Sequence, residues 1–168
     1  MLSGLSREPS MSMTDPFKAL VSLQAEIRKG MLTHPTEKYP SVRLVFDEKN
    51  GRARYTYARI EHGRVKAMAM FVSMEKINGI GCFQVGYAVP ESYRGRGWAT
   101  EILQQGLEEL SKGLARHGVT HFYVQAVVST SNLASVGVAT RLLSSTPDSI
   151  VDSVSGEPAL AFTRLVDC

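Results

Sequence analysis

A glycine-and-arginine segment at residues 93–100 has the residue types and spacing of an anion site. It reads Tyr-Arg-Gly-Arg-Gly-Trp-Ala-Thr, follows an apolar run at 83–89 and leads into an amphipathic run that begins at Ala99. In a strand–turn–helix order, the first backbone N–H groups of the helix lack partners, and the helix dipole adds partial positive charge. Gly95 and Gly97 let a ligand approach the backbone closely. The segment therefore predicts a site for a pyrophosphate.

The elements that must position this segment can be predicted from the spacing of apolar residues. Expected helices cover 16–31, 99–116 and 132–143, and expected strands cover 42–46, 52–60, 65–74, 83–89, 121–128, 148–152 and 160–165. The Asn50-Gly51 pair between the first two strands is a strong hairpin signal. A single strand–helix–strand crossover among hairpin-connected strands predicts a mixed α+β fold.

Length and composition are those of an ordinary globular domain. The chain has 168 residues, of which 43% are hydrophobic and 21% are charged, and this length fits one domain. We expect a disordered tail at 1–13, where periodicity is missing, and a single domain over 14–168. No apolar run approaches the ~18 residues that a membrane span needs, and the first residues lack the features of a secretory signal. These observations predict a cytoplasmic protein with no membrane partner.

Charge and cysteine content argue against two classes of function. A net charge of +3 is too small to indicate a nucleic-acid partner, so none is expected. Basic residues outnumber acidic ones between Val42 and Lys66, which fits either an anionic ligand or a solvated strand face. Cys82 and Cys168 belong to no Cys/His cluster, so no metal site is expected.

Two motifs resemble those of the GCN5-related N-acetyltransferase (GNAT) family. Arg94, Gly97 and Ala99 fill the family's motif A, (Gln/Arg)-x-x-Gly-x-(Gly/Ala). The spacing of Asn132 and Ser135 is similar to the Asn-x-x-Ser motif of the branch that acetylates ribosomal-protein N-termini. The resemblance implies the GNAT fold, which has a central, mostly antiparallel twisted sheet with a splayed parallel strand pair and flanking helices.

The resemblance also implies that acetyl-CoA is the co-substrate. Backbone N–H groups of residues 95–100 would hold its pyrophosphate, and exposed backbone at 87–89 would hydrogen-bond the pantetheine arm. Arg94 and Arg96 either add charge near the phosphates or face solvent, and Trp98 is expected to pack the helix onto the sheet rather than stack on the cofactor. The candidate cofactor-binding residues are Tyr87, Ala88, Val89, Arg94, Gly95, Arg96, Gly97, Trp98, Ala99, Thr100 and Asn132.

The reaction implied by the resemblance is direct attack of a neutral amine on the thioester, which needs a proton acceptor and a donor for the leaving thiolate. Many family members use a tyrosine seven positions after the asparagine, but this chain has Ala139 there. Ser135 could donate to the thiolate or satisfy local backbone, and Asn132 could cap the helix or contact the pantetheine or a water. The candidate bases are Glu75, Glu91, His121, Tyr87 and a chain of water molecules. Our catalytic set is Ser135, Asn132, Glu75 and His121.

The function expected from the sequence is therefore acetyl transfer to a primary amine in a ternary complex. The acceptor is a small molecule, a protein N-terminus or a lysine. The alternatives are a longer acyl-CoA as donor, or a regulatory module that binds acyl-CoA without turnover. Residues 142–145 depart from the family's Leu-Gly-Phe ending, which leaves the shape of the acceptor site open. The oligomeric state is also open, with a homodimer as one option.

Overall fold

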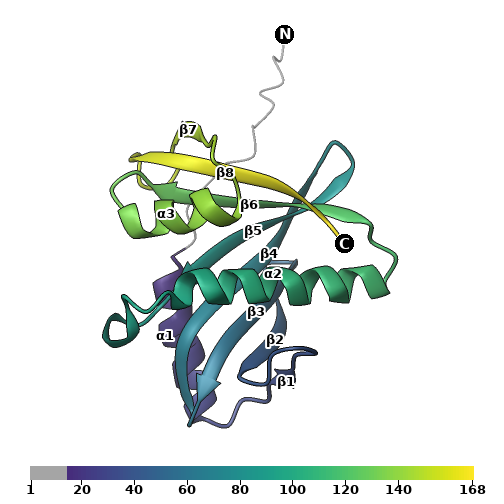
Figure 1. The fold of residues 1–168 in the computed structure, drawn as a ribbon, viewed down its shortest axis with the longest axis vertical. Helices are drawn as coiled ribbons and strands as arrows, with labels where there is room; N and C mark the ends of the chain where they lie inside the picture. Colours follow the sequence, from purple (N-terminus) through teal and green to yellow (C-terminus); the bar gives the residue numbers. More distant parts are fainter. Residues whose placement is uncertain (1–14) are drawn as a thin grey trace.

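The computed structural model describes residues 15–168 (Figure 1). The tail expected at 1–13 lies outside these residues. Eight strands form one sheet in the order β1-β2-β3-β4-β5-β6-β8-β7. The strands are β1 (His34–Pro35), β2 (Val42–Lys49), β3 (Arg52–Glu61), β4 (Arg64–Ile77), β5 (Ile80–Ala88), β6 (His121–Ser129), β7 (Asp148–Val151) and β8 (Pro158–Asp167). Neighbouring strands are antiparallel except β5 and β6, which are parallel. The mixed α+β fold predicted from the sequence is confirmed.

Tight turns fix the register of the first half of the sheet. Asn50 and Gly51, between β2 and β3, have φ values of 54° and 74°, and positive φ at both central residues is typical of a type I′ hairpin turn. Such a turn matches the right-handed twist of the two strands. The hairpin predicted at Asn50-Gly51 is therefore confirmed, and β2 pairs with β3 from Lys49 and Arg52 to Val42 and Arg59.

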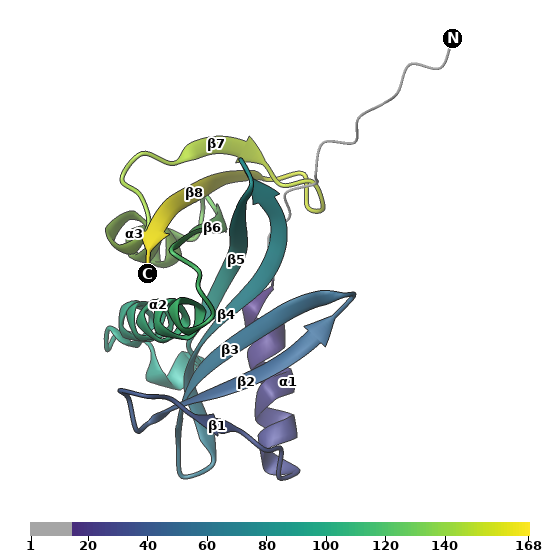
Figure 2. The ribbon, with the colours of Figure 1, turned by 90° about the vertical axis from the view of Figure 1, so that its right-hand side faces the viewer.

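Helices cover both faces of the sheet (Figure 2). The helix α1 (Pro16–Arg28) packs on one face, where Leu20 and Leu23 join a buried cluster with residues of β2, β3 and β4. The helices α2 (Trp98–Arg116) and α3 (Leu133–Leu142) pack on the other face and share a larger buried cluster with the sheet. Strands β4 and β5 are therefore covered on both sides, which explains the continuous buried runs at 67–71 and 82–87. None of the helices in residues 15–168 is long and apolar enough to cross a membrane.

Close packing of α2 against the sheet depends on Gly106. A Cβ atom on Gly106 would lie 3.0 Å from Cε2 of Phe71 and 3.4 Å from Cδ2 of Tyr57. Phe71 is fully buried, so its ring cannot move aside without disturbing the core. Because glycine has no side chain, α2 can lie this close to β4 at Gly106.

Replacing Gly106 with leucine is expected to lower the free energy of unfolding by about 2 kcal/mol, because the added carbons overpack the core. Gly113 lies on the same helix, and a Cβ there would meet only the Arg116 guanidinium at 3.8 Å. Gly113→Ala is expected to stabilise the protein by about 0.5–1 kcal/mol through helix propensity. Urea unfolding followed by circular dichroism measures both. Equal effects of the two substitutions would contradict the packing described here.

Candidate active site

The parallel strands β5 and β6 separate at one end. Their register pairs are Cys82 with Tyr123, Phe83 with Val124 and Gln84 with Gln125. Beyond these pairs, β5 continues to Ala88 and β6 continues to Ser129 without pairing to each other. The facing backbone groups are consequently open to another hydrogen-bonding chain. The family resemblance predicted this splay. It lies at the end of β5 that leads to the glycine-and-arginine segment.

The segment after β5 forms a turn that presents backbone N–H groups, which we call the glycine loop (residues 94–97). Gly95 and Gly97 have φ values of 78° and 75°, in the left-handed region that glycine adopts without strain. Gly97 is the N-cap of α2 and gives no side-chain cap, and the N–H of Glu101 is the first to bond back to the Gly97 carbonyl, at 3.1 Å. The N–H groups of residues 98–100 are therefore left without intrahelical acceptors.

A cavity of about 620 Å³, the loop cavity, joins the glycine loop to the end of β5 and the start of α3. It brings together every predicted cofactor-binding residue except Arg96. Those that line it are Tyr87, Ala88, Val89, Arg94, Gly95, Gly97, Trp98, Ala99, Thr100 and Asn132. Ser135 also lines it. Residues far apart in the sequence thus converge on one site large enough for a cofactor.

The two arginines of the glycine loop are placed differently. Arg94 lines the loop cavity, and its Nε donates to the Val89 carbonyl at 3.1 Å, which ties the loop to the end of β5. The guanidinium of Arg96 does not line this cavity and lies 5.4 Å from the ring centre of Trp98 and 5.9 Å from that of Tyr93. Arg94 is consequently the better placed of the two to face a bound anion.

Trp98 connects the glycine loop to the sheet. The guanidinium carbon of Arg59, on β3, lies 4.3 Å from the Trp98 ring centre, within cation–π range. Arg59 also pairs with Glu61 at 3.1 Å and with Glu101 at 3.6 Å. Lys66, on β4, pairs with Glu61 at 2.8 Å, and Lys66 and Arg59 lower the pKa of the Glu61 carboxyl. The excess positive charge between Val42 and Lys66 is thus partly neutralised by ion pairs with Glu61 and Glu101.

The start of α3 is held by two hydrogen bonds. Asn132 is the N-cap, and its Oδ1 accepts from the Ser135 N–H at 3.2 Å. The Tyr87 hydroxyl donates to the Ser135 carbonyl at 2.7 Å, so the Tyr87 side chain spans from β5 to α3. Burial raises the pKa of the Tyr87 phenol, and the Ser135 side chain beside it opposes part of that rise. The phenol is therefore neutral, and the Ser135 hydroxyl lies next to it.

A second, smaller cavity of about 110 Å³, the splay cavity, lies between the diverging ends of β5 and β6. Pro16, Tyr87, Asn132 and Ser135 line both cavities. These four residues therefore mark the place where a ligand in the loop cavity would meet one in the splay. Ser135 is the member of this group that combines an aliphatic hydroxyl with access to both.

Two of the predicted catalytic residues lie at the other end of the strands. His121 begins β6, near the start of β5, and its Nδ1 is 2.8 Å from the Thr120 hydroxyl. Glu75 lies at the irregularity after Met74, the partner of Cys82 at the start of β5. Neither residue lines the loop cavity or the splay cavity, and neither does the candidate base Glu91. The structure does not bring these carboxylates and this imidazole to the site.

The start of α1 contributes lining residues that were not predicted from the sequence. Asp15, Pro16 and Phe17 line the loop cavity, and Phe17 is 47% exposed. The sequence shows a phenylalanine in the first turn of the expected helix, but nothing in the sequence places that turn beside β5. Arg141, on α3, also lines the cavity and adds a positive charge.

In the part of the chain that the structure describes, no cluster of His, Cys, Asp or Glu could hold a metal ion.

Comparison with solved structures identifies the class of fold. An acetyltransferase of the GNAT family from Streptococcus pneumoniae superposes with a TM-score of 0.51 at 10% identity, covering 92% of this chain and 96% of that chain. The chain thus has the fold of a GNAT acetyltransferase. A family model described as the acetyltransferase (GNAT) domain matches residues 21–142, and the chain belongs to this family. No curated protein sequence matches the chain.

Two other solved structures match a smaller share of the chain. RimL, a ribosomal L7/L12 alpha-N-protein acetyltransferase in complex with coenzyme A, is 22% identical, with a TM-score of 0.49 over 68% of this chain. The present chain covers 63% of that RimL chain. A ribosomal-protein-alanine N-acetyltransferase from Brucella melitensis is 15% identical, with a TM-score of 0.49 over 70% of each chain.

Proposed function

We propose that the protein is an acetyl-CoA-dependent N-acetyltransferase that transfers the acetyl group to a primary amine within a ternary complex. The observation that carries this proposal is the loop cavity, which runs from unpaired helix N–H groups at the glycine loop to the open edge of β5. The first feature suits a pyrophosphate, and the second suits the amides of a pantetheine arm. Membership of the GNAT domain family supports the same donor.

The roles of the residues follow from their positions. The N–H groups of 98–100 and the Arg94 side chain bind the pyrophosphate, and the backbone of 87–89 holds the pantetheine and polarises the thioester carbonyl. The amine attacks this carbonyl from the splay cavity, the carbon–sulfur bond breaks, and the Ser135 hydroxyl donates a hydrogen bond to the leaving thiolate. Because Glu75 and His121 lie away from the cavities, the proton of the ammonium leaves through water to bulk solvent.

We propose the acceptor as a class of compound, the primary amines. A protein N-terminus is the acceptor suggested by the Asn132-x-x-Ser135 element, and a lysine or a small amine is the alternative. A second candidate function, an acyl-CoA-binding module without turnover, is favoured by two observations. Ala139 replaces the tyrosine expected from the resemblance, and the predicted bases Glu75, Glu91 and His121 lie outside the loop and splay cavities.

Binding and turnover measured separately distinguish these functions. We expect acetyl-CoA to raise the melting temperature, and we expect free thiol to be released when an acceptor is added. The acceptors are small primary amines, a peptide with a free N-terminus and blocked lysines, and the same peptide with an acetylated N-terminus and one free lysine. Stabilisation without thiol release from any acceptor would favour the module. No stabilisation by acetyl-CoA would contradict both functions.

A further inference from the structure

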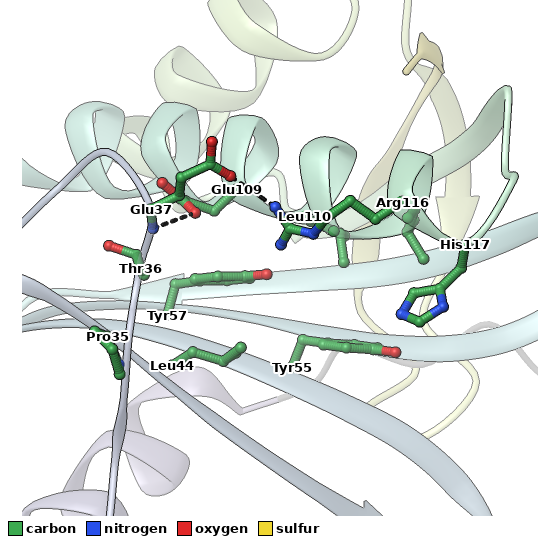
Figure 3. Close-up of a pocket in the computed structure, with 12 residues that line it drawn as sticks. Pro35, Thr36, Glu37, Leu44, Tyr55, Tyr57, Glu109, Leu110, Arg116 and His117 are labelled. Atoms are coloured by element: carbon green, nitrogen blue, oxygen red, sulfur yellow. Dashed lines mark hydrogen bonds and ion pairs between the residues drawn. The ribbon is translucent and has the colours of Figure 1, made fainter.

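A third cavity, of about 230 Å³, lies under the C-terminal half of α2 (Figure 3). We call it the tyrosine cavity, because Tyr55 and Tyr57 of β3 form part of its wall. It shares no lining residue with the loop cavity or the splay cavity. The glycine loop is at the opposite end of α2, a helix of 19 residues that is about 28 Å long at 1.5 Å per residue. The tyrosine cavity is therefore a separate place on the molecule.

The wall opposite the sheet is fixed by polar contacts. Glu109, on α2, is only 5% exposed, and its carboxylate accepts from the backbone N–H groups of Glu37 and Lys38 at 3.0 and 2.8 Å. The Glu37 carboxylate pairs with Arg116 at 2.6 Å. Tyr39 also hydrogen-bonds Glu108. These contacts hold the segment before β2 against α2, so the cavity has built walls on each side.

The Tyr57 hydroxyl is a polar group at the cavity that lacks a partner in the described residues. Tyr57 is 3% exposed, and its ring packs edge to face on Phe71 with centroids 6.0 Å apart. Within residues 15–168, its hydroxyl makes no hydrogen bond. Figure 3 shows the rings of Tyr55 and Tyr57 beneath α2, with both hydroxyl ends directed toward the end of the helix that carries His117. No fully buried side-chain nitrogen or oxygen atom in residues 15–168 lacks a partner, so this hydroxyl is in contact with the open space of the cavity and can accept a hydrogen bond from a ligand there.

The charges around the cavity favour a cation. Of the two carboxylates in its lining, Glu37 pairs with the Arg116 guanidinium, whereas Glu109 accepts hydrogen bonds from backbone N–H groups and forms no ion pair within residues 15–168. The last carbonyls of α2 add partial negative charge at this end of the helix, and the tyrosine rings present the negative faces of their π systems. Burial and then the Glu109 charge raise the pKa of the Tyr57 phenol, and the Arg116 charge opposes part of that rise, so the Glu109 carboxylate has the larger effect of these two opposite charges at this hydroxyl.

We propose that the tyrosine cavity binds a small aliphatic ammonium ion. Its apolar chain contacts Leu44 and Leu110, and its N–H groups donate to the Tyr57 oxygen, where the Glu109 charge favours a cation. The cavity is smaller than the roughly 300 Å³ at which pockets for drug-sized ligands begin, which limits the ligand to a short chain. This site is independent of the proposed acetyl transfer.

Titration of the full chain with n-butylammonium, followed by amide NMR without acetyl-CoA, tests the proposal. The amides of Gly113 and His117 are expected to shift and saturate. Butyrate, which has the same length and the opposite charge, is expected to leave them unchanged. Tyr57→Phe keeps the ring and removes the hydroxyl, and it should weaken binding at least about tenfold, the cost of one hydrogen bond to a charged group.

A second variant keeps the test decisive if Tyr57→Phe perturbs the fold. Glu37 is exposed, so Glu37→Gln leaves the core intact and should also weaken butylammonium binding, whereas Glu48→Gln on β2 should not. Equal binding of butyrate, or unchanged binding by both Tyr57→Phe and Glu37→Gln, would overturn the proposal. Shifts confined to Gly97 and Ser135 would overturn it as well, and would place the amine at the proposed acceptor site instead. Acetyl-CoA binding is measured separately, so the two proposals fail independently.

Discussion

Gly97→Val is expected to weaken acetyl-CoA binding about 50-fold, because two effects combine at this residue. Gly97 has a φ of 75°, where a β-branched residue is strained by roughly 1–3 kcal/mol. Relief of that strain turns the N–H groups of residues 98–100 away from the ligand. The valine side chain also projects into the loop cavity that Gly97 lines. Isothermal titration with acetyl-CoA measures the loss.

Gly118→Val is the matched control for this prediction. Gly118 has a φ of 82°, and a Cβ atom placed on it would meet no heavy atom within 4 Å, as is true of Gly97. It follows the other end of α2, so its strain lowers stability without touching the loop cavity. We expect Gly118→Val to lower the melting temperature about as much as Gly97→Val and to leave acetyl-CoA affinity unchanged. A parallel loss of affinity in both variants would mean that the effect is one of stability alone.

Ser135→Ala is expected to lower kcat by about 100-fold, the lower end of the range for removal of a hydrogen-bond donor to a developing negative charge, while acetyl-CoA affinity changes little. The reason is that Ser135 lines both cavities, whereas its backbone N–H and carbonyl hold Asn132 and Tyr87. The alanine variant keeps these backbone bonds. Steady-state release of free thiol, with the acceptor that gives turnover, measures the change.

Thr140→Val serves as the control for Ser135→Ala. Thr140 lies on the same helix, and its hydroxyl donates to the Val136 carbonyl at 2.7 Å, on the exposed side. Loss of this hydroxyl should leave kcat within about twofold, because an exposed hydrogen bond contributes little to the position of the helix. If Ser135→Ala retains full kcat, Ser135 serves only to join α3 to Asn132 and Tyr87.

The parts of the site that were predicted from the sequence are those specified locally. The glycine loop, α2 and the cap at Asn132 each depend on residues adjacent in the chain, so the sequence predicts them together with their direction. The positions of Glu75 and His121 depend on which end of a strand faces the splay. That follows from the order and direction of β4, β5 and β6, which short-range patterns do not specify.

Contacts between distant segments account for the features that could not be predicted. The start of α1 reaches the loop cavity because Leu20 and Leu23 dock on the face of the sheet opposite α2. The clamp between Glu109 and the backbone of residues 37 and 38 joins segments more than 70 positions apart. A glutamate on a helix is ordinarily solvated, and only the tertiary structure shows that this one is buried and paired.

The short pairing between β5 and β6 has a mechanical consequence for the sheet. Strands β1 to β5 form one half-sheet and β6 to β8 form the other, and the register pairs at 82–84 and 123–125 are the backbone seam between them. Side chains also join the halves: the Phe83 ring of β5 packs edge to face on the Phe122 ring of β6, with centroids 5.7 Å apart. With so few backbone pairs between the halves, the width of the gap in which an acyl group and an amine would meet depends on side-chain packing as well as on the backbone.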